Sequence, residues 1–274
     1  MLGSVLIAGI VLGSAGSAPN VEAELVLPYR SVVAGDEFPV GIRLDIEKPW
    51  HIYWMNPGDT GIPTTIKWEL PKGWTVSRLS FPTPHRYDDE GMVSYTHEGQ
   101  VDFVAWVKAP AGARMGESVD IKAQVNWLAC IDSCIPGSAK VEGSLVVGSQ
   151  ARLDVKASEK LAEMRSVQPK SWRGIYSISQ MDDGDLIASF GGMETKEAFF
   201  FAESAEVVEP SAAQTVIESG PGGFGLRLKK SPYAQGKAER LRGVLRLKDT
   251  EGKEQSFWID APIRELKEGE HNRK

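Results

Sequence analysis

Apolar residues alternate with polar or small residues in many short runs of this chain, and this period of two most constrains the fold. Successive side chains of a β-strand point to opposite faces, so each such run predicts a strand with one buried face. In the first half of the chain the runs lie at 21–27, 38–46, 101–107, 119–127 and 139–147. Turn-forming stretches such as Ala34-Gly35-Asp36 separate them. Short strands without a long helix predict an all-β chain that begins with an immunoglobulin-like antiparallel β-sandwich.

One helical segment interrupts the strand pattern. Residues 157–165 are rich in helix formers, with Leu161 and Met164 on one face, Ser158 as a candidate N-cap, and Pro169 as the stop. Strand patterns then return at 175–179, 185–190, 198–202, 215–218, 224–228, 243–248 and 256–259. They predict a second, smaller β-sandwich.

A chain of 274 residues fits two domains of ordinary size. The expected order is a signal-like segment at 1–20, an immunoglobulin-fold domain at 21–149, a helical linker at 150–169, a second β-sandwich at 170–265 and a polar tail at 266–274.

The N-terminus and the net charge indicate the compartment and the kind of partner. Residues 2–18 are apolar or small, and the apolar core from Val5 to Leu12 is too short to span a bilayer, which is typical of a secretory signal. Cleavage could follow Ala18 or Ala23, and the other interpretation is a disordered N-terminus. An exported protein can keep disulfides. The net charge of −6 argues against a nucleic-acid partner.

The two cysteines of the chain, Cys130 and Cys134, lie between the two best-patterned runs of the first half. Residues four apart on one straight strand lie roughly 13 Å apart, too far for a bond, whereas across a turn they can meet. The segment between them carries Asp132-Ser133, and Pro136-Gly137 follows. We therefore expect the two cysteines to flank the tip of a β-hairpin.

This spacing leaves three interpretations open. A bridge that closes a loop of about five residues stabilises a fold by only about 2 kcal/mol in the chain-entropy treatment, so a structural staple would gain more from distant cysteines. A metal site needs more ligands, and the His and Met residues are scattered. A redox-active pair is the third interpretation. A hairpin tip offers no helix N-terminus to activate a thiol, and Asp132 disfavours a thiolate, so such a pair would suit a relay that a better nucleophile attacks.

Three motifs in order resemble the N-terminal periplasmic domain of the DsbD and ScsB thiol-disulfide reductases. They are Trp50-His51-Ile52-Tyr53-Trp54-Met55-Asn56-Pro57-Gly58-Asp59-Thr60-Gly61-Ile62-Pro63-Thr64, then Ile66-Lys67-Trp68, then Trp127-Leu128-Ala129-Cys130 running to Cys134-Ile135-Pro136-Gly137. The aromatic residues of the first motif are most simply core packing around a tight turn. The region after the helix resembles the later part of ScsB-type N-terminal regions more weakly.

The resemblance implies an immunoglobulin-like redox domain with Cys130 and Cys134 as its catalytic pair, without a cofactor or metal. It implies that Cys134 forms the mixed disulfide with a partner. It also implies a cap loop at 87–95 that shields the cysteines until a partner docks, with Asp89 and Glu90 as its acidic residues and Met92 or Tyr95 as the cover. The alternative for this stretch is an ordinary solvated loop.

The implied partners are a thioredoxin-like electron donor and a periplasmic disulfide-containing protein or isomerase, with a membrane electron-transfer domain in cis or in trans. The expected function is therefore thiol-disulfide interchange in the bacterial periplasm. Two rival functions remain at this point. One is a non-catalytic partner-binding module with an inert hairpin bridge, and the other is a copper-handling protein that uses the reduced cysteines with a nearby Met or His.

Overall fold

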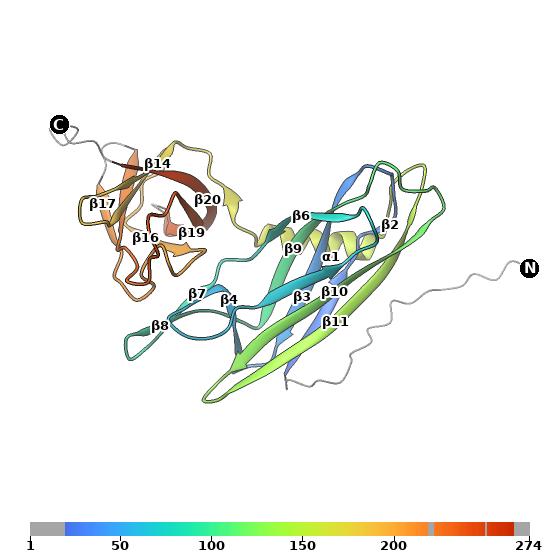
Figure 1. The fold of residues 1–274 in the computed structure, drawn as a ribbon, viewed down its shortest axis with the longest axis horizontal. Helices are drawn as coiled ribbons and strands as arrows, with labels where there is room; N and C mark the ends of the chain where they lie inside the picture. Colours follow the sequence, from blue (N-terminus) through green and yellow to red (C-terminus); the bar gives the residue numbers. More distant parts are fainter. Residues whose placement is uncertain (1–19, 219–221, 250, 266–274) are drawn as a thin grey trace, which may run out of the picture. The chain divides into compact units, whose positions relative to one another are not determined.

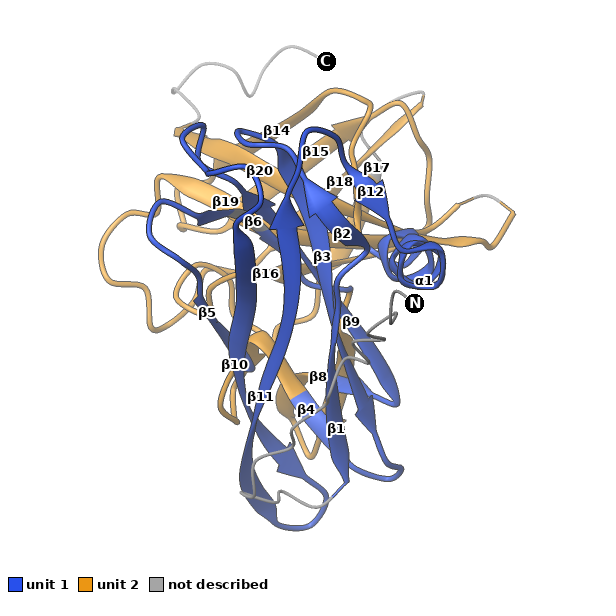
Figure 2. Ribbon diagram, turned by 90° about the vertical axis from the view of Figure 1, so that its right-hand side faces the viewer, with its two compact units in different colours: residues 1–52, 64–82, 97–168 blue, residues 53–63, 83–96, 169–274 orange. Residues whose placement is uncertain are grey.

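The structure is a computed structural model that describes residues 20–218, 222–249 and 251–265. Residues 1–19 of the signal-like segment and the predicted tail at 266–274 lie outside this part of the chain. The chain forms two compact units (Figure 2). Unit 1 comprises residues 1–52, 64–82 and 97–168, and unit 2 comprises residues 53–63, 83–96 and 169–274. Residues 53–63 and 83–96 fall within the range predicted for the first domain, and in the structure they group with the second.

Unit 1 is a β-sandwich built from the runs of alternating residues (Figure 1). Its first sheet has the antiparallel order β1 (Val21–Val26), β3 (Glu37–Ile46), β9 (Gln100–Lys108) and β6 (Thr75–Ser80). Its second sheet has the order β12 (Arg152–Leu153), β2 (Tyr29–Val32), β11 (Cys134–Val147) and β10 (Ser118–Cys130), with β5 (Thr65–Glu69) also paired to β10. The pairing of β2 with β11 is parallel.

Side chains from both sheets meet in one core, as the period of two predicts. The inward-facing residues include Phe38, Val40, Val107, Val119, Ile121 and Leu145, and each is at most 2% exposed. The immunoglobulin-like sandwich expected from the sequence is therefore confirmed.

The helix α1 (Val155–Ser166) begins one turn earlier than its predicted cap. Asp154 is the N-cap, and its Oδ1 accepts a hydrogen bond from the backbone N of Ala157 at 3.1 Å. The prediction of Ser158 was wrong, because Ser158 lies inside the helix and its hydroxyl donates to the carbonyl of Asp154 at 2.6 Å. Both residue types can cap a helix, and here Arg30 holds the Asp154 carboxylate at 2.9 Å.

The helix packs on unit 1, where it covers the first sheet on the side away from the sandwich core. Leu161 and Met164 are buried against Val26 of β1 and Val104 of β9. A Cβ on Gly41 of β3 would lie 2.5 Å from the Met164 Cε, so a larger residue there would force the Met164 side chain to move. The predicted linker segment thus carries a third layer of unit 1.

A buried ion pair lies on the same sheet. Arg43 and Asp102 are cross-strand partners on β3 and β9. The guanidinium donates to both carboxylate oxygens, at 2.7 and 3.0 Å, and the two side chains are 9% and 5% exposed. The hydrogen bond to Asp102 raises the pKa of Arg43 further above its usual value.

The C-terminal part of unit 2 is a second β-sandwich, as predicted. Its strands follow the order β16 (Glu197–Ala202), β19 (Arg240–Lys248), β20 (Glu254–Glu265), β14 (Tyr176–Gln180), β15 (Leu186–Gly191), β18 (Gly223–Leu228) and β17 (Thr215–Glu218), and β13 (Lys170–Ser171) also pairs with β20. The long β20 pairs with β19 and then, in parallel, with β14, and so joins the two sheets. Phe190, Phe200, Phe224 and Leu245 are among the core residues.

Among the described residues, unit 2 also includes β7 (His85–Asp89) and most of β4 (His51–Gly58) and β8 (Met92–Glu98). The strand β4 begins in unit 1, where His51 pairs with Cys130, and its later residues belong to unit 2. There it neighbours β8, which pairs with β7 in an antiparallel hairpin.

We predict that Asp102→Ala lowers the free energy of unfolding by about 3–5 kcal/mol, because it leaves the Arg43 charge buried without a partner. Urea denaturation followed by tryptophan fluorescence measures this loss. Asp120→Ala is the control, since Asp120 pairs with Lys122 on the exposed surface of the same unit and its removal should cost less than about 1 kcal/mol. Equal losses in the two variants would contradict a structural role for the buried pair.

Candidate functional site

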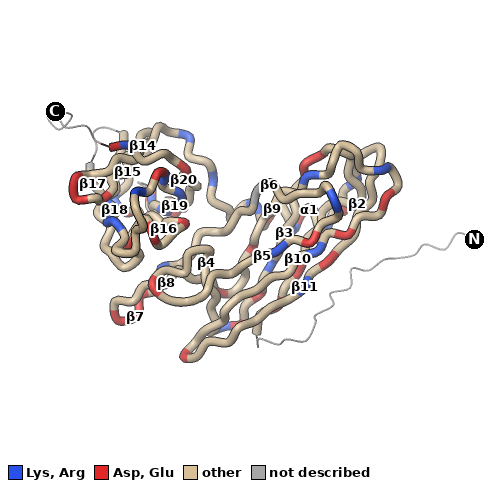
Figure 3. Tube along the Cα trace, viewed as in Figure 1, with Lys and Arg blue, Asp and Glu red and all other residues tan. Residues whose placement is uncertain are grey.

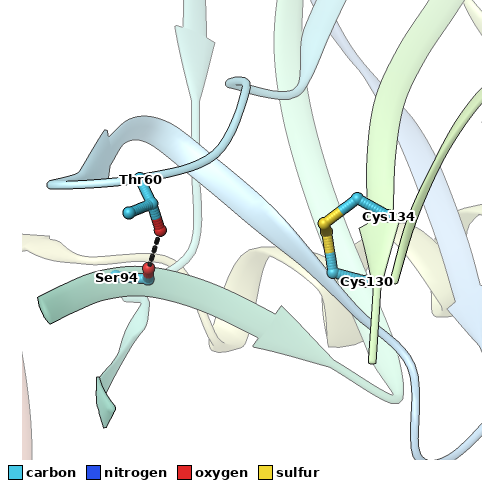
Figure 4. The surroundings of a disulfide bond; sticks show 4 residues. All are labelled: Thr60, Ser94, Cys130 and Cys134. Carbon is cyan, nitrogen blue, oxygen red and sulfur yellow. Dashed lines mark hydrogen bonds between the residues drawn. A yellow bond between two sulfur atoms is a disulfide. The ribbon is translucent and has the colours of Figure 1, made fainter. Parts of the chain in front are cut away.

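The two cysteines face each other across the end of the β10–β11 hairpin. The ladder runs without a break from Ser118 opposite Val146 to Cys130 opposite Cys134. The sulfur atoms form a disulfide, with a Cα–Cα distance of 4.2 Å (Figure 4). Only three residues, 131–133, close the turn, and the N–H of Ile131 donates to the carbonyl of Ser133 at 3.2 Å. The predicted position at a hairpin tip is confirmed.

The two halves of the disulfide differ in exposure. Cys130 is 2% exposed and has β4 beside it, where His51 is its strand partner. Cys134 is exposed, as are the three residues of the turn. A thiol from another protein would therefore reach the Cys134 side of the bond more readily.

No helix terminus activates this pair in the part of the chain that the structure describes. Its single helix, α1, packs on the opposite sheet of unit 1. The tip of the β10–β11 hairpin is acidic, as Figure 3 shows, and Asp132 lies in its sequence. A negative charge opposes the formation of a thiolate. The disulfide is therefore open to attack by the thiolate of another protein, whereas little in the site would stabilise a thiolate of its own.

His51 brings a titratable group to the strand next to Cys130. Burial lowers its pKa, because the imidazolium loses hydration, and the negative charge of Glu98 partly opposes this effect. Near neutral pH the side chain is therefore held uncharged and adds no cation that would stabilise a nearby thiolate.

The predicted cap residues all lie on the β7–β8 hairpin, in unit 2, whereas the cysteines lie in unit 1. Asp89 ends β7 opposite Met92, and Glu90 occupies the turn with φ 51°. Asp89 and Glu90 are exposed, and Met92 is 55% exposed. Tyr95 is 1% exposed, and burial raises the pKa of its hydroxyl.

The side chain of Tyr95 belongs to an aromatic cluster within unit 2, formed with Trp54, Phe199 and Phe201. Its ring centroid lies 6.3 Å from Trp54, 6.2 Å from Phe199 and 5.0 Å from Phe201, each in an edge-to-face arrangement. Trp54 also meets Phe201 at 6.4 Å. Such pairs add about 0.5–1.5 kcal/mol each beyond the burial of their area.

The first sequence motif holds this hairpin in a way that sequence reasoning missed. Asp59 forms two hydrogen bonds with the backbone of Val93 in β8. Its N–H donates to the Val93 carbonyl at 2.7 Å, and its carboxylate accepts from the Val93 N–H at 2.8 Å. Thr60 and Ser94 share a hydroxyl–hydroxyl bond at 2.9 Å (Figure 4). Of the aromatic residues predicted to pack in the core, Tyr53 and Trp54 are buried, whereas Trp50 is only partly buried. The available signal was the run of hydrogen-bonding side chains that follows them in the sequence.

Asn56 extends the same motif to the second sandwich. Its side chain donates to the carbonyl of Ala202 at 2.8 Å and accepts from the N–H of Gly58 at 3.0 Å, and the residue is 2% exposed. Gly58 has φ +89°, and a Cβ there would lie 2.3 Å from the Val93 carbonyl oxygen. The motif therefore needs its glycine for a close backbone approach as well as for a turn.

The described residues contain no group of three or more His, Cys, Asp or Glu side chains placed to hold a metal ion. Within the same ranges, none of the helical structure has the length and apolar character needed to cross a bilayer.

Comparison with known proteins adds two findings. Residues 22–145 match the family model for the N-terminal region of the thiol:disulfide interchange protein DsbD. The N-terminal periplasmic domain of ScsB from Proteus mirabilis has a similar structure, with a TM-score of 0.54 over 89% of this chain and 92% of that one, at 13% identity. This similarity extends over both sandwiches and establishes the shared fold.

The N-terminal domain of DsbD from Neisseria meningitidis in the reduced form aligns with 49% of this chain and 89% of its own, at 14% identity and a TM-score of 0.28. No curated protein sequence matches the chain.

We predict that Gly58→Ala destabilises unit 2 by more than Gly91→Ala does. Both glycines have positive φ, so both variants suffer the strain of a left-handed side chain, about 1–2 kcal/mol. Only at Gly58 does the new Cβ meet a backbone oxygen, since nothing lies within 4 Å of a Cβ at Gly91. Thermal unfolding of the two variants measures the difference, and equal shifts would show that the approach to Val93 is unimportant.

We also predict that part of the pH dependence of stability comes from His51. Its folded-state pKa lies below the unfolded value, so the unfolded chain takes up a proton first and stability falls as the pH drops through about 6.5. Urea unfolding at pH 7.5 and 5.5 should show a smaller loss of stability for His51→Gln than for the wild type. His85→Gln, at an exposed position, is the control and should behave as the wild type does.

Proposed function

We propose that this chain, whose residues 22–145 match the family model for the N-terminal region of DsbD, relays electrons between thiol–disulfide partners through Cys130 and Cys134. The observation that carries the proposal is the cross-strand disulfide at the tip of β10–β11, with one buried and one exposed cysteine. The exposed position of Cys134 gives a partner thiol access to the bond, which a purely structural bridge does not require.

The difference in exposure suggests the order of the steps. A thiolate of a reduced donor attacks the Sγ of Cys134, the bond between the cysteines breaks, and Cys130 leaves as a thiolate that takes a proton from water. The second donor thiol then attacks the donor sulfur of the mixed disulfide and releases Cys134. The donor has lost two electrons, and the pair has gained them.

The reverse sequence delivers the electrons. The Cys134 thiolate attacks the disulfide of an oxidised partner, and Cys130 then attacks the Sγ of Cys134, which closes the hairpin bridge and releases the reduced partner. Cys130 acts as the resolving cysteine in this scheme. Its burial protects it from attack by a second partner.

The proposed donors and acceptors are those that the family resemblance implies. We assign a thioredoxin-like protein, or a membrane domain that performs the same exchange, as the donor, and a periplasmic disulfide-containing protein or isomerase as the acceptor. The periplasm is the compartment of the ScsB domain that shares this fold, and it is oxidising enough to need such a reductant.

The cap role of Asp89, Glu90, Met92 and Tyr95 is part of the same proposal. It rests on the family resemblance and on the form of the hairpin that carries them, which has an acidic tip and exposed Met92. A shield of this kind would protect the bond from small thiols and leave it open to a partner that displaces the hairpin.

The test is to trap the mixed disulfide with a thioredoxin variant that lacks its resolving cysteine. The Cys130→Ser protein keeps the exposed sulfur, so after activation of Cys134 with Ellman's reagent it should form a covalent complex. Cys134→Ser, treated alike, should form at least about tenfold less, because its remaining sulfur is buried. Gel electrophoresis without reductant measures both.

Equilibration of the wild-type protein with glutathione buffers provides the independent measurement. A reduction potential above about −300 mV is expected of a relay. A lower value, together with no mixed disulfide in either variant, would identify the pair as a structural bridge and overturn the proposal.

A further inference from the structure

Strand β11 has an open edge directly beside the exposed cysteine. On one side it pairs with β10 along its whole length. On the other side, among the described strands, only β2 pairs with it, at Val146 and Val147. The stretch from Cys134 to Ser144 therefore lies at the edge of its sheet (Figure 1). Unpaired backbone of this kind is a ready template for a strand of another chain.

The register determines which backbone groups point out of this edge. The N–H of Val147 donates to the carbonyl of Glu117, on the β10 side. The N–H of Gly148 donates to the carbonyl of Val32 in β2, on the side of the open edge. Because backbone groups alternate between the two sides of a strand, the even-numbered residues of β11 direct theirs to the open edge. The Cα–Cα distance of 4.2 Å across the disulfide agrees, since it is typical of cross-strand pairs that exchange no backbone hydrogen bonds.

Three residues at the disulfide end of this edge present such groups. Cys134 and Ser138 each direct an N–H and a carbonyl outward, whereas Pro136 has only a carbonyl to offer. In the described part of the chain, no hydrogen bond to another segment uses these groups. From Cys134 to Ser138 they extend over about 13 Å, at about 3.3 Å per residue, which is the length of a short strand.

The chemistry of disulfide exchange brings the attacking thiolate to the same edge. The thiolate approaches a sulfur in line with the bond that breaks, from the side opposite the leaving sulfur, and forms a mixed disulfide. The bond here joins β10 to β11 (Figure 4). A thiolate that attacks Cys134 and displaces Cys130 therefore approaches from beyond β11. The protein that delivers it lies alongside the unpaired backbone of this strand.

We propose that the redox partner docks by adding an extended segment to the open edge of β11, where it pairs with the outward backbone groups of Cys134, Pro136 and Ser138. The inference rests on the proposed function, because it takes Cys134 as the cysteine that exchanges with the partner. Main-chain hydrogen bonds give affinity without requiring particular side chains. One edge can therefore serve both the protein that donates electrons and the protein that accepts them.

A second copy of this chain fits the edge less well than a partner held at Cys134. Proline and lysine are residues that natural edge strands use against pairing with one another, and Pro136 and Lys140 lie on this edge. A mixed disulfide raises the effective concentration of the partner's segment at the edge, so a pairing of a few bonds is sufficient.

Ser138→Pro tests the pairing, because proline has no N–H to donate and its ring blocks an added strand. The hairpin keeps its ladder, since the N–H of Ser138 points away from β10. We expect thioredoxin to reduce this variant about tenfold more slowly than the wild type, the scale of one or two lost backbone hydrogen bonds. Reduction by dithiothreitol, which has no backbone to pair, should stay within about twofold. Alkylation of the released thiols and mass spectrometry measure both rates.

Glu142→Pro is the matched control. It places the same ring at the same kind of outward position, about 26 Å from Cys134 at about 3.3 Å per residue. The ion pair that it removes, with Lys122, is exposed and contributes little to stability. Both rates should stay within about twofold of the wild type. An unchanged rate with thioredoxin in Ser138→Pro, or an equal slowing with dithiothreitol or in Glu142→Pro, would overturn the inference.

Hydrogen exchange in a trapped complex separates the docking from the function beneath it. In the mixed disulfide between the Cys130→Ser protein and a thioredoxin without its resolving cysteine, the Ser138 amide should exchange at least about tenfold more slowly than in the free protein. A complex that forms while Ser138 stays unprotected would overturn the docking alone. Slow exchange at Ser138 in the free protein, together with a dimer in sedimentation, would overturn it in favour of a second copy. Failure to form any complex would overturn the proposed function and, with it, this inference.

Discussion

The register of β10 against β11 is the constraint on which the site depends. Thirteen cross-strand pairs connect Ser118–Val146 at one end to Cys130–Cys134 at the other. Val119, Ile121 and Leu145 fix this register, because a slip by one residue would turn their side chains from the core to the opposite face. The hydrophobic burial of one end of the hairpin thus determines that two sulfur atoms meet at the other. Core packing at one end of the hairpin therefore positions the disulfide at the other end.

The same alternation explains which parts of the fold could be predicted. Strands in which apolar residues alternate with polar or small ones in the sequence, such as β3, β10 and β19, show the period of two and were found from the sequence. In β4 and β8 successive residues are buried, since both faces of these strands are covered, and the pattern disappears. The helix was found and its N-cap was not, because Asp154 and Ser158 are both residue types that cap helices. Only the ion pair between Arg30 and Asp154, which are distant in the sequence, distinguishes the actual N-cap from the predicted one.

The site was predictable to the same degree. Two cysteines around a turn between two alternating runs gave the hairpin, and the burial of one cysteine beside His51 did not follow from any local pattern. The predicted cap residues are together on one hairpin, yet Tyr95 faces Phe199 and Phe201, more than a hundred positions further along the chain. Contacts of that sequence separation depend on how distant strands pack, and single-sequence patterns carry no record of it. For the same reason, the motif from Asn56 to Gly61 was interpreted as a turn from its sequence. In the structure its side chains also form hydrogen bonds to strands that are distant in the sequence.

Control of access is the form of regulation that suits such a site. Thiol reactivity can be regulated through the thiol pKa or through exposure. The described residues give the pair no helix terminus, the turn carries an acidic residue, and burial keeps His51 uncharged near neutral pH, so electrostatics does little to activate it. Exposure is the remaining variable, and it already differs between the two cysteines.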